Sequence, residues 1–375
     1  MLRTEFLGLK MKSPIVVAAG PWSRGQERIE ELYKAGAGAI VTETIVSVPN
    51  IDVRPRLAYN GLGLENIRLF SGMPLEQWID EISEIKKNRK GKDELIIANI
   101  LAHTPSEIAY IAKKIEKAGA DAIEVGLACP MGSGIEVIAS DPELAFKLTE
   151  ATVSAVNIPV IVKLSQSMRN VPEIIAAVEK AGVKGISAID TVRCILGIDV
   201  NKRKPILPSY GGYSGEAIRP LGLASVAAIA QSSKLPICGI GGISSAENAL
   251  EYMMVGAKTV GIGTAIFING PKFISKIKAD LESWMRENNL EKLDDICGVA
   301  LEKLMPLDEI TVEPLVAYIK DNCVLTPEEC GFCINCCIDN AISYEDKIYI
   351  NKESCTGCGL CVDVCPKKAI ELVWK

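Results

Sequence analysis

The sequence lacks any apolar segment long enough to cross a membrane. No run reaches the roughly 18 consecutive apolar residues that a membrane-spanning helix needs. The opening segment, MLRTEFLGLKMKSP, also lacks the apolar stretch of a secretion signal. We therefore expect a soluble protein of the cytoplasm with no membrane partner. With 48% hydrophobic residues and a mean hydropathy of +0.21, the 375 residues can bury a large core.

An excess of positive charge is also absent. The 41 Lys and Arg residues are outnumbered by 47 Asp and Glu residues, so the formal net charge is −6 at pH 7. A nucleic-acid partner is excluded because phosphate binding needs a clustered basic surface. No G-x-G-x-x-G dinucleotide motif follows a predicted strand. The expected partners are small molecules or other proteins.

Cysteine is scarce over most of the chain and dense at its end. Of the 13 cysteines, nine lie between Cys323 and Cys365. The expected compartment keeps thiols reduced, so clustered cysteines indicate metal binding rather than disulfides. The composition thus predicts a body over 1–300, a linker over 301–322 and a metal-binding domain over 323–375. Cys194, Cys238 and Cys297 are interpreted as ordinary buried thiols.

Short apolar runs alternate with helical patterns along the body. One helical segment, TPSEIAYIAKKIEKAG, has Thr104 as a cap, Pro105 at its start and Gly119 at its end. Apolar strands joined by helices are typical of a sheet covered by helices, and eight such units fit a closed (β/α)₈ TIM barrel. The alternative is an open doubly wound sheet. The predicted strands are SPIVVAAG (13–20), GAIVTETI (38–45), LIIANIL (95–101), AIEVGLAC (122–129), PVIVKLS (159–165), GISAID (185–190), PICGIGGI (236–243) and TVGIGTAIF (259–267).

Glycine-rich segments end the seventh and eighth predicted strands, as GIGGIS (239–244) and GIGTAI (261–266). In a TIM barrel these two loops are the habitual phosphate site, because backbone N–H groups without side chains nearby can approach an anion. A third glycine-rich segment, YGGYSGEAIRP (210–220), precedes strand seven and could close over the same group.

These segments, with NGLGLEN (60–66), IANI (97–100) and VKLS (162–165), resemble the class 1 dihydroorotate dehydrogenases and the flavin domain of dihydropyrimidine dehydrogenases. The resemblance runs from about residue 3 to residue 275. It implies FMN, with hydride transfer between a substrate CH–CH bond and flavin N5. The implied phosphate contacts are Gly215, Gly241, Gly242, Gly263 and Thr264, and the ring contacts are Ala19, Gly20, Asn99, Lys163 and Thr191.

Lys163 also has a chemical rationale. A reduced flavin carries negative charge near N1, and an ammonium at the end of strand five can stabilise it. The alternative is a lysine that extends from the barrel rim into solvent.

Cys129 follows the fourth predicted strand and is the candidate catalytic base. The family motif at this point is Asn-x-Ser-Cys-Pro-Asn, whereas this chain has Gly126 and Met131 in place of the two asparagines. Amide side chains match the alternating C=O and N–H edge of a pyrimidine, so their loss makes strict orotate specificity doubtful. The remaining substrate-contact candidates are Asn60, with Asp190 and Thr191 after strand six.

Glu43 and His103 are two further candidate residues near the ends of predicted strands. Glu43 ends strand two, where the family usually has lysine; it favours a less anionic substrate than orotate, or it is a solvated rim carboxylate. His103, the only histidine, either faces the same mouth or is a surface group at a helix start.

The cysteine-rich end contains CTGCGLCVDVCP (355–366), which has the C-x₂-C-x₂-C-x₃-C-P spacing of bacterial ferredoxins. A degenerate copy, ECGFCINCCIDNAI (329–342), precedes it. The pattern predicts a ferredoxin-like α+β domain with two [4Fe–4S] clusters. One quartet is Cys330, Cys333, Cys336 and Cys365; the other is Cys355, Cys358, Cys361 and Cys337. Cys323 is an alternative to Cys336.

A flavin exchanges electron pairs and clusters pass single electrons, so this combination predicts an oxidoreductase that serves a one-electron protein partner. The expected partner is ferredoxin or an NAD(P)H-oxidising flavoprotein subunit, in a homodimer or a hetero-oligomer. Two alternatives stay open: the same flavin chemistry on a non-pyrimidine conjugated carbonyl compound, or an electron-transfer subunit without its own substrate.

Overall fold

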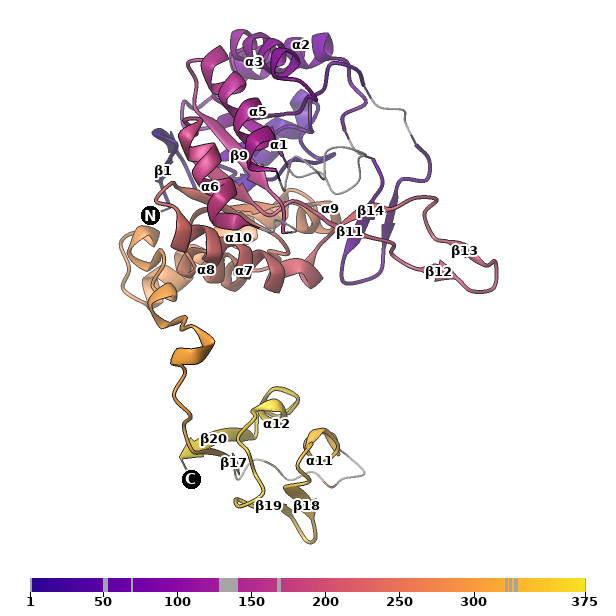
Figure 1. The fold of residues 1–375 in the computed structure, drawn as a ribbon, viewed down its shortest axis with the longest axis vertical. Coiled ribbons are helices and arrows are strands. Elements are labelled where there is room, and N and C mark those ends of the chain that lie inside the picture. Colours follow the sequence, from indigo (N-terminus) through magenta and orange to yellow (C-terminus); the bar gives the residue numbers. More distant parts are fainter. Residues whose placement is uncertain are drawn as a thin grey trace. The chain divides into compact units, whose positions relative to one another are not determined.

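The computed structural model describes residues 2–49, 53–68, 70–127, 141–166, 170–320, 323, 326 and 330–374. Chain contacts divide it into two compact units, Met1–Leu304 and Met305–Lys375. Neither unit holds, among the described residues, a helix long and apolar enough to span a membrane. Figure 1 shows the larger unit with its helices packed around a central sheet.

A closed barrel of eight parallel strands forms the larger unit, which confirms the predicted fold class. The hydrogen-bonded order β3-β4-β7-β8-β9-β10-β15-β16 follows the chain and returns to β3. Continuous burial explains the continuous apolar runs: all six residues of β7 and all five of β8 are buried. The strands are β3 (Ile15–Val17), β4 (Ala39–Val41), β7 (Leu95–Ile100), β8 (Ala122–Gly126), β9 (Val160–Leu164), β10 (Gly185–Ala188), β15 (Ile237–Ile240) and β16 (Ala257–Ile262).

Helices cover the outside of the barrel and bury one apolar face each. In α3, the Thr104 hydroxyl accepts the Glu107 N–H and Gly119 ends the helix with a φ of 105°, as the sequence predicts. The second half of the predicted strand 259–267 is instead the short helix α9. The helices are α1 (Gln26–Ala35), α2 (Leu75–Asn88), α3 (Pro105–Ala118), α5 (Pro142–Ala155), α6 (Val171–Lys180), α7 (Arg219–Ser232), α8 (Ala246–Met254), α9 (Thr264–Asn269) and α10 (Lys272–Glu287).

A four-stranded antiparallel sheet, absent from the sequence prediction, lies beside the barrel mouth. Its order is β11-β14-β6-β5, with a further hairpin, β12–β13, that projects from it (Figure 1). It brings together NGLGLEN from the second βα connection and YGGYS from the sixth. The elements are β5 (Leu57–Tyr59), β6 (Leu64–Asn66), β11 (Val192–Cys194), β12 (Ile198–Asp199), β13 (Lys204–Pro205), β14 (Gly211–Ser214) and the 3₁₀ turn η1 (Glu216–Ile218).

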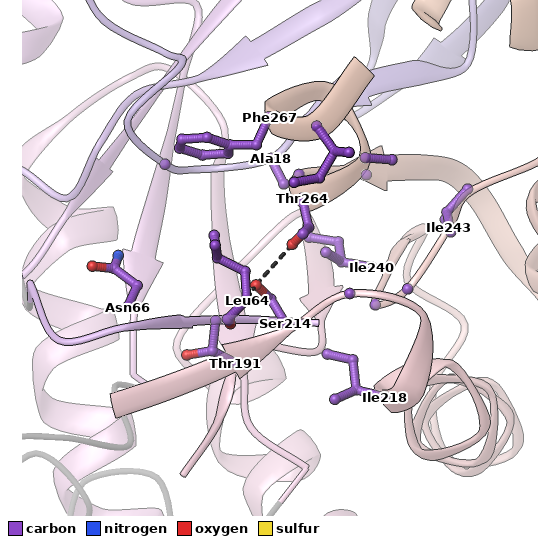
Figure 2. A pocket seen from close by; sticks show the side chains of 18 of the residues that line it. Ala18, Leu64, Asn66, Thr191, Ser214, Ile218, Ile240, Ile243, Thr264 and Phe267 are labelled. Atoms are coloured by element: carbon purple, nitrogen blue, oxygen red, sulfur yellow. Dashed lines mark hydrogen bonds between the residues drawn. The ribbon is translucent and has the colours of Figure 1, made fainter. Parts of the chain in front are cut away.

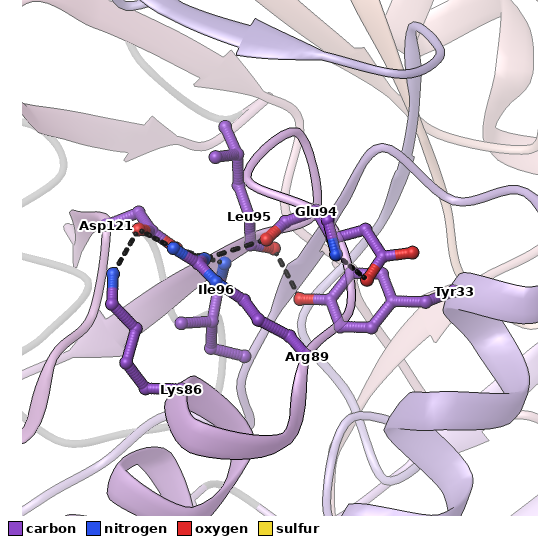
Figure 3. Close-up of polar contacts among 8 residues, drawn as sticks. Tyr33, Lys86, Arg89, Glu94, Leu95, Ile96 and Asp121 are labelled. Carbon is purple, nitrogen blue, oxygen red and sulfur yellow. Dashed lines mark hydrogen bonds and ion pairs between the residues drawn. The ribbon is translucent and has the colours of Figure 1, made fainter.

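The amino end of the barrel is held by a polar network around Asp121, shown in Figure 3. Arg89 Nη2 and Lys86 Nζ both lie 3.0 Å from Asp121 Oδ1, and the Ile96 N–H donates to Oδ2 over 2.9 Å. The Tyr33 hydroxyl donates to the Leu95 carbonyl over 2.7 Å. A short hairpin of β1 (Thr4–Phe6) and β2 (Leu9–Met11) precedes the first barrel strand.

The smaller unit contains two antiparallel strand pairs and two short helices around a cysteine-rich core. The pair β17–β20 includes residues of the expected linker 301–322, so this unit extends upstream of residue 323. The 3₁₀ turns η2 (Leu293–Ile296) and η3 (Leu301–Lys303) precede this unit in the chain, and η4 (Leu307–Glu309) lies near its start. Its elements are β17 (Leu315–Ile319), α11 (Phe332–Cys336), β18 (Ile342–Tyr344), β19 (Ile348–Ile350), α12 (Leu360–Asp363) and β20 (Ile370–Trp374).

Candidate functional site

A deep cavity opens at the carboxyl ends of the barrel strands. It is lined by the segments that follow β3, β10, β15 and β16, together with β5, β6, β14 and η1 from the mouth sheet. Figure 2 shows Ser214, Thr264 and Ile218 from different elements around it. Ten of the predicted site residues lie in its wall: Ala19, Gly20, Lys163, Asp190, Thr191, Gly215, Gly241, Gly242, Gly263 and Thr264.

Three glycines of this wall have positive φ angles: 111° at Gly215, 134° at Gly241 and 68° at Gly242. A Cβ on Gly242 would lie 2.8 Å from the Gly215 carbonyl oxygen, so the two segments approach each other through bare backbone. The Thr264 hydroxyl donates to Ser214 Oγ over 2.7 Å and joins α9 to β14 (Figure 2). The three glycine-rich segments therefore form one cradle, as their order in the sequence predicts.

A second, more polar cavity adjoins the first and shares several of its residues. Lys163, whose side chain is only 5% exposed, lies in the wall of both. The shared residues are Ala19, Gly20, Pro21, Asn66, Lys163, Asp190 and Thr191; the second cavity adds Glu43, Thr44, Arg68, Phe70, Asn99, Leu101 and Gly126. Burial of the lysine between two cavities is not the geometry of a side chain that extends into solvent.

Asn99 is held by a buried carboxylate behind the second cavity. Its Nδ2 donates to Glu124 Oε1 over 2.5 Å, and the Ser187 hydroxyl donates to Glu124 Oε2 over 2.5 Å. All three residues are at most 2% exposed. An ionised carboxylate only accepts hydrogen bonds, so it directs the Asn99 N–H groups toward itself. The Asn99 carbonyl oxygen is buried and has no hydrogen-bond partner among the residues that the structure describes.

Glu43 is neither a solvated rim carboxylate nor an isolated negative charge. Its Oε2 lies 3.4 Å from Arg68 Nη2 and 4.0 Å from Arg24 Nη1. Glu43 and Arg68 are both buried, with side chains 5% and 6% exposed. The carboxylate is therefore neutralised inside the wall, and its partner arginine is another residue that the sequence interpretation did not name.

Two predicted residues fall elsewhere. Asn60 does not line either cavity: its Oδ1 accepts the N–H groups of Leu62 and Gly63, which closes the β5–β6 turn. Asn66, at the base of the same hairpin, lines both cavities instead and is labelled in Figure 2. His103 is exposed at the start of α3. Cys129 and Met131 lie outside the described residues.

The cysteines of the smaller unit gather around its core. A pocket there is lined by Cys336, Cys337, Cys355, Cys358 and Cys361. Burial raises the pKa of Cys361 to about 11, and the neighbouring Cys336, Cys355 and Cys358 thiols contribute in the same direction. No three donors among the described residues are close enough to share one metal ion. A cubane does not need that, because each thiolate binds a different iron atom.

Comparison with known proteins extends these observations. A family model described as dihydroorotate dehydrogenase matches residues 1–285. The chain belongs to the dihydroorotate dehydrogenase family. A second model, described as a 4Fe–4S binding domain, matches residues 348–371. The resemblance read from the sequence is therefore confirmed, and the chain is a flavin-dependent oxidoreductase of this family with an iron–sulfur domain.

Curated relatives cover either the barrel or the whole chain. The catalytic subunit of dihydroorotate dehydrogenase B (NAD(+)) from Methanocaldococcus jannaschii is 34% identical over 80% of this chain and 99% of its own length. The NAD-dependent dihydropyrimidine dehydrogenase subunit PreA of Escherichia coli is 28% identical over 99% of this chain and 95% of its own length. A solved dihydroorotate dehydrogenase from Eimeria tenella, in complex with ferulenol, has a TM-score of 0.71 at 18% identity, covering 80% of this chain and 88% of that chain; it supports the fold.

The residues present fit the cofactors that these families imply. The glycine cradle would be filled by added Cβ atoms, and the buried Asn99 oxygen needs a donor that a flavin ring could supply. In the smaller unit, soft thiol donors in a shared core suit iron–sulfur chemistry.

Proposed function

We propose that the barrel binds FMN and interconverts a C–C single bond and an activated C=C bond, in the manner of dihydroorotate and dihydropyrimidine dehydrogenases. One observation carries this proposal: a glycine-framed cavity adjoins a polar cavity, and Lys163 lies in the wall of both. We assign the phosphate to the backbone of Gly215, Gly241, Gly242, Gly263 and Thr264, and the ring to the space near Ala19, Gly20, Asn99, Lys163 and Thr191.

FMN, when bound, would supply a hydride acceptor at the substrate carbon that can pass electrons on one at a time. Lys163 supplies positive charge that stabilises the reduced form. Asn99 presents to a ligand N–H its carbonyl oxygen, which no described residue hydrogen-bonds. We assign the proton to Cys129: its thiolate takes the proton from the carbon next to the one that loses hydride, the C–H pair becomes the second bond of C=C, and a thiol forms.

The substrate proposed is uncharged. Among the described residues, the charged side chains that line the second cavity are Glu43 and Asp190 against Arg68 and Lys163, so their charges balance. Arg68 is also paired with Glu43 and is not free to bind a carboxylate. This arrangement favours a neutral pyrimidine over the carboxylate of orotate. Asn66, Asp190 and Thr191 are the proposed substrate contacts, whereas the geometry of Asn60 favours a structural role in its turn.

A conjugated carbonyl compound other than a pyrimidine is the second candidate. It is favoured by Gly126, where an added Cβ would lie 3.3 Å from the Asn99 oxygen. Gly126 therefore contributes space beside Asn99 rather than the amide side chain of the family motif. A ligand with fewer hydrogen-bonding groups than a pyrimidine would fill that space without leaving a polar edge unpaired.

Two [4Fe–4S] clusters in the smaller unit are proposed to relay the electrons. One cluster would be bound by Cys355, Cys358, Cys361 and Cys337. Three iron atoms of the other would be bound by Cys330, Cys333 and Cys365. The E. coli relative is named as an NAD-dependent enzyme's subunit. We therefore propose a hetero-oligomer in which a separate NAD(P)H-oxidising flavoprotein subunit, or ferredoxin, exchanges electrons with these clusters.

Anaerobic bleaching of the flavin tests this function. Dihydrouracil or dihydrothymine should reduce the FMN of the purified chain, and dihydroorotate should do so more slowly. Cys129→Ala should retain FMN and slow the bleaching about 100-fold. Cys297→Ala, in the barrel unit and far along the chain from the proposed base, is the matched control and should behave as the parent. Equal rates for parent and Cys129→Ala would remove the thiol from the mechanism.

A further inference from the structure

The smaller unit consists of two halves that repeat with a spacing of 28 residues. Cys333 in α11 and Cys361 in α12 are both buried. Cys337 Sγ accepts the Ala341 N–H over 3.2 Å, and Cys365 Sγ accepts the Ala369 N–H over 3.3 Å.

The backbone repeats in the same register. Asn340 and Lys368 have positive φ angles of 50° and 48°. Their N–H groups donate to the carbonyls of Cys337 and Cys365 over 3.2 and 3.1 Å. Corresponding residues of the two halves are therefore fixed by geometry, and not only by the cysteine pattern.

This register changes how the upstream motif is read. Cys330, Cys333 and Cys337 correspond to Cys358, Cys361 and Cys365. Cys336 corresponds to Val364 and has no cysteine counterpart. The counterpart of Cys355 would be residue 327, which is proline. The upstream half therefore has an additional thiol, Cys336, inside α11. It lacks a cysteine at the position that corresponds to Cys355.

Cys336 lies with the downstream cysteines. It lines the same pocket as Cys337, Cys355, Cys358 and Cys361, whereas Cys330 and Cys333 do not line it. Cys337 and Cys358 are its close neighbours. Its Sγ donates to the Cys333 carbonyl over 3.4 Å.

Cys323 lies on the upstream side, tied by the backbone to the loop of Cys365. The Cys323 N–H donates to the Lys320 carbonyl over 3.2 Å, and the Lys320 N–H donates to the Ala369 carbonyl over 2.8 Å. Ala369 is the residue that donates to Cys365 Sγ. Cys323 and Cys330 are both close neighbours of Cys333. Cys323, Cys330, Cys333 and Cys365 therefore belong to one side of the core.

We propose that Cys323, with Cys330, Cys333 and Cys365, binds the upstream [4Fe–4S] cluster, and that Cys336 is a non-ligand thiol beside the downstream one. The upstream spacing is then C-x₆-C-x₂-C-x₃-C, with a longer first loop than in the downstream motif. This ligand set rests on the two clusters of the proposed function.

Serine variants of the full chain test the assignment by iron and acid-labile sulfide content and by electron paramagnetic resonance after reduction. The parent should hold about eight iron atoms. Cys323→Ser and Cys330→Ser, which is a ligand in either assignment, should each fall to about four while keeping FMN and the downstream signal. Cys336→Ser should keep about eight.

Loss of a cluster in Cys336→Ser, or about eight irons in Cys323→Ser, would overturn the assignment. About four irons in the parent itself would instead contradict the two-cluster function and the assignment with it, and would be seen before any variant is made. Retention of FMN and of the downstream signal in Cys323→Ser distinguishes loss of a ligand from misfolding of the chain.

Discussion

Asn99 donates its amide N–H to Glu124 over 2.5 Å, and its own carbonyl oxygen, in the wall of the second cavity, has no hydrogen-bond partner within the described part of the chain. The two residues lie opposite each other on adjacent strands, β7 and β8. Because the carboxylate can only accept, it decides which end of the Asn99 amide faces a ligand. Glu124, which lies behind the cavity wall, thus determines which polar atom of Asn99 faces the cavity.

Glu124→Gln should weaken flavin binding about tenfold, because the new amide allows Asn99 to turn its N–H groups toward the cavity. Fluorescence of FMN on dilution of the holoprotein measures the dissociation constant. Ser187→Ala removes the other hydrogen bond to Glu124 and leaves the Asn99 contact in place, so it is the control. Equal affinities in Glu124→Gln and the parent would show that Asn99 does not contact the flavin.

Lys163→Met should lower the midpoint potential of the flavin and slow its reduction by substrate about 100-fold, since a buried positive charge is lost from the wall of both cavities. Spectroelectrochemistry measures the potential, and anaerobic stopped flow measures the rate. Lys184→Met, just before β10 and exposed, is the control. An unchanged potential would place Lys163 away from the ring.

Gly242→Ala should abolish tight FMN binding. The new Cβ would lie 2.8 Å from both the Gly215 oxygen and Arg219 Cβ, and the φ of 68° is unfavourable for alanine. Gly8→Ala has a similar φ of 77° with no atom within 4 Å of the new Cβ, so it reproduces the backbone strain alone. If both variants bind FMN equally, the cradle does not hold the phosphate.

Asp121→Ala should destabilise the barrel by about 3 kcal/mol without changing the chemistry, because the Arg89 guanidinium, with a side chain only 11% exposed, loses its carboxylate partner at the end opposite the cavities (Figure 3). Urea unfolding followed by circular dichroism gives the free energy. Lys86→Ala, which removes a more exposed partner of the same carboxylate, should cost less than about 1 kcal/mol. A flavin affinity that falls in parallel with stability would contradict the separation of the two ends.

The sequence predicted the parts of the molecule that repeat or bury apolar faces. All eight barrel strands, the caps of α3 and the glycine cradle follow from local patterns. It did not predict the mouth sheet, whose strands come from connections far apart in the chain and pair only in three dimensions. For the same reason it selected Asn60 rather than Asn66: both belong to NGLGLEN, and only the hairpin register decides which amide lies in the turn and which at the cavity.

The balance of charge at the barrel mouth could not be predicted from the sequence either. Glu43 alone suggested an altered substrate charge, but Arg68 and Arg24, which neutralise it, lie on other segments. The sequence left the choice between Cys336 and Cys323 open, because Cys336 continues the C-x₂-C-x₂-C spacing while the adjacent Cys337 takes the place that corresponds to Cys365.

The most direct test of the account is the reoxidation of the reduced flavin under anaerobic conditions. The purified chain would be reduced chemically, and flavin absorbance followed as uracil, thymine, orotate and several enoyl compounds are added in turn. The account predicts rapid reoxidation by uracil or thymine and slower reoxidation by orotate. Reoxidation by none of these acceptors would contradict it, and would leave the chain as a carrier of electrons without a substrate of its own.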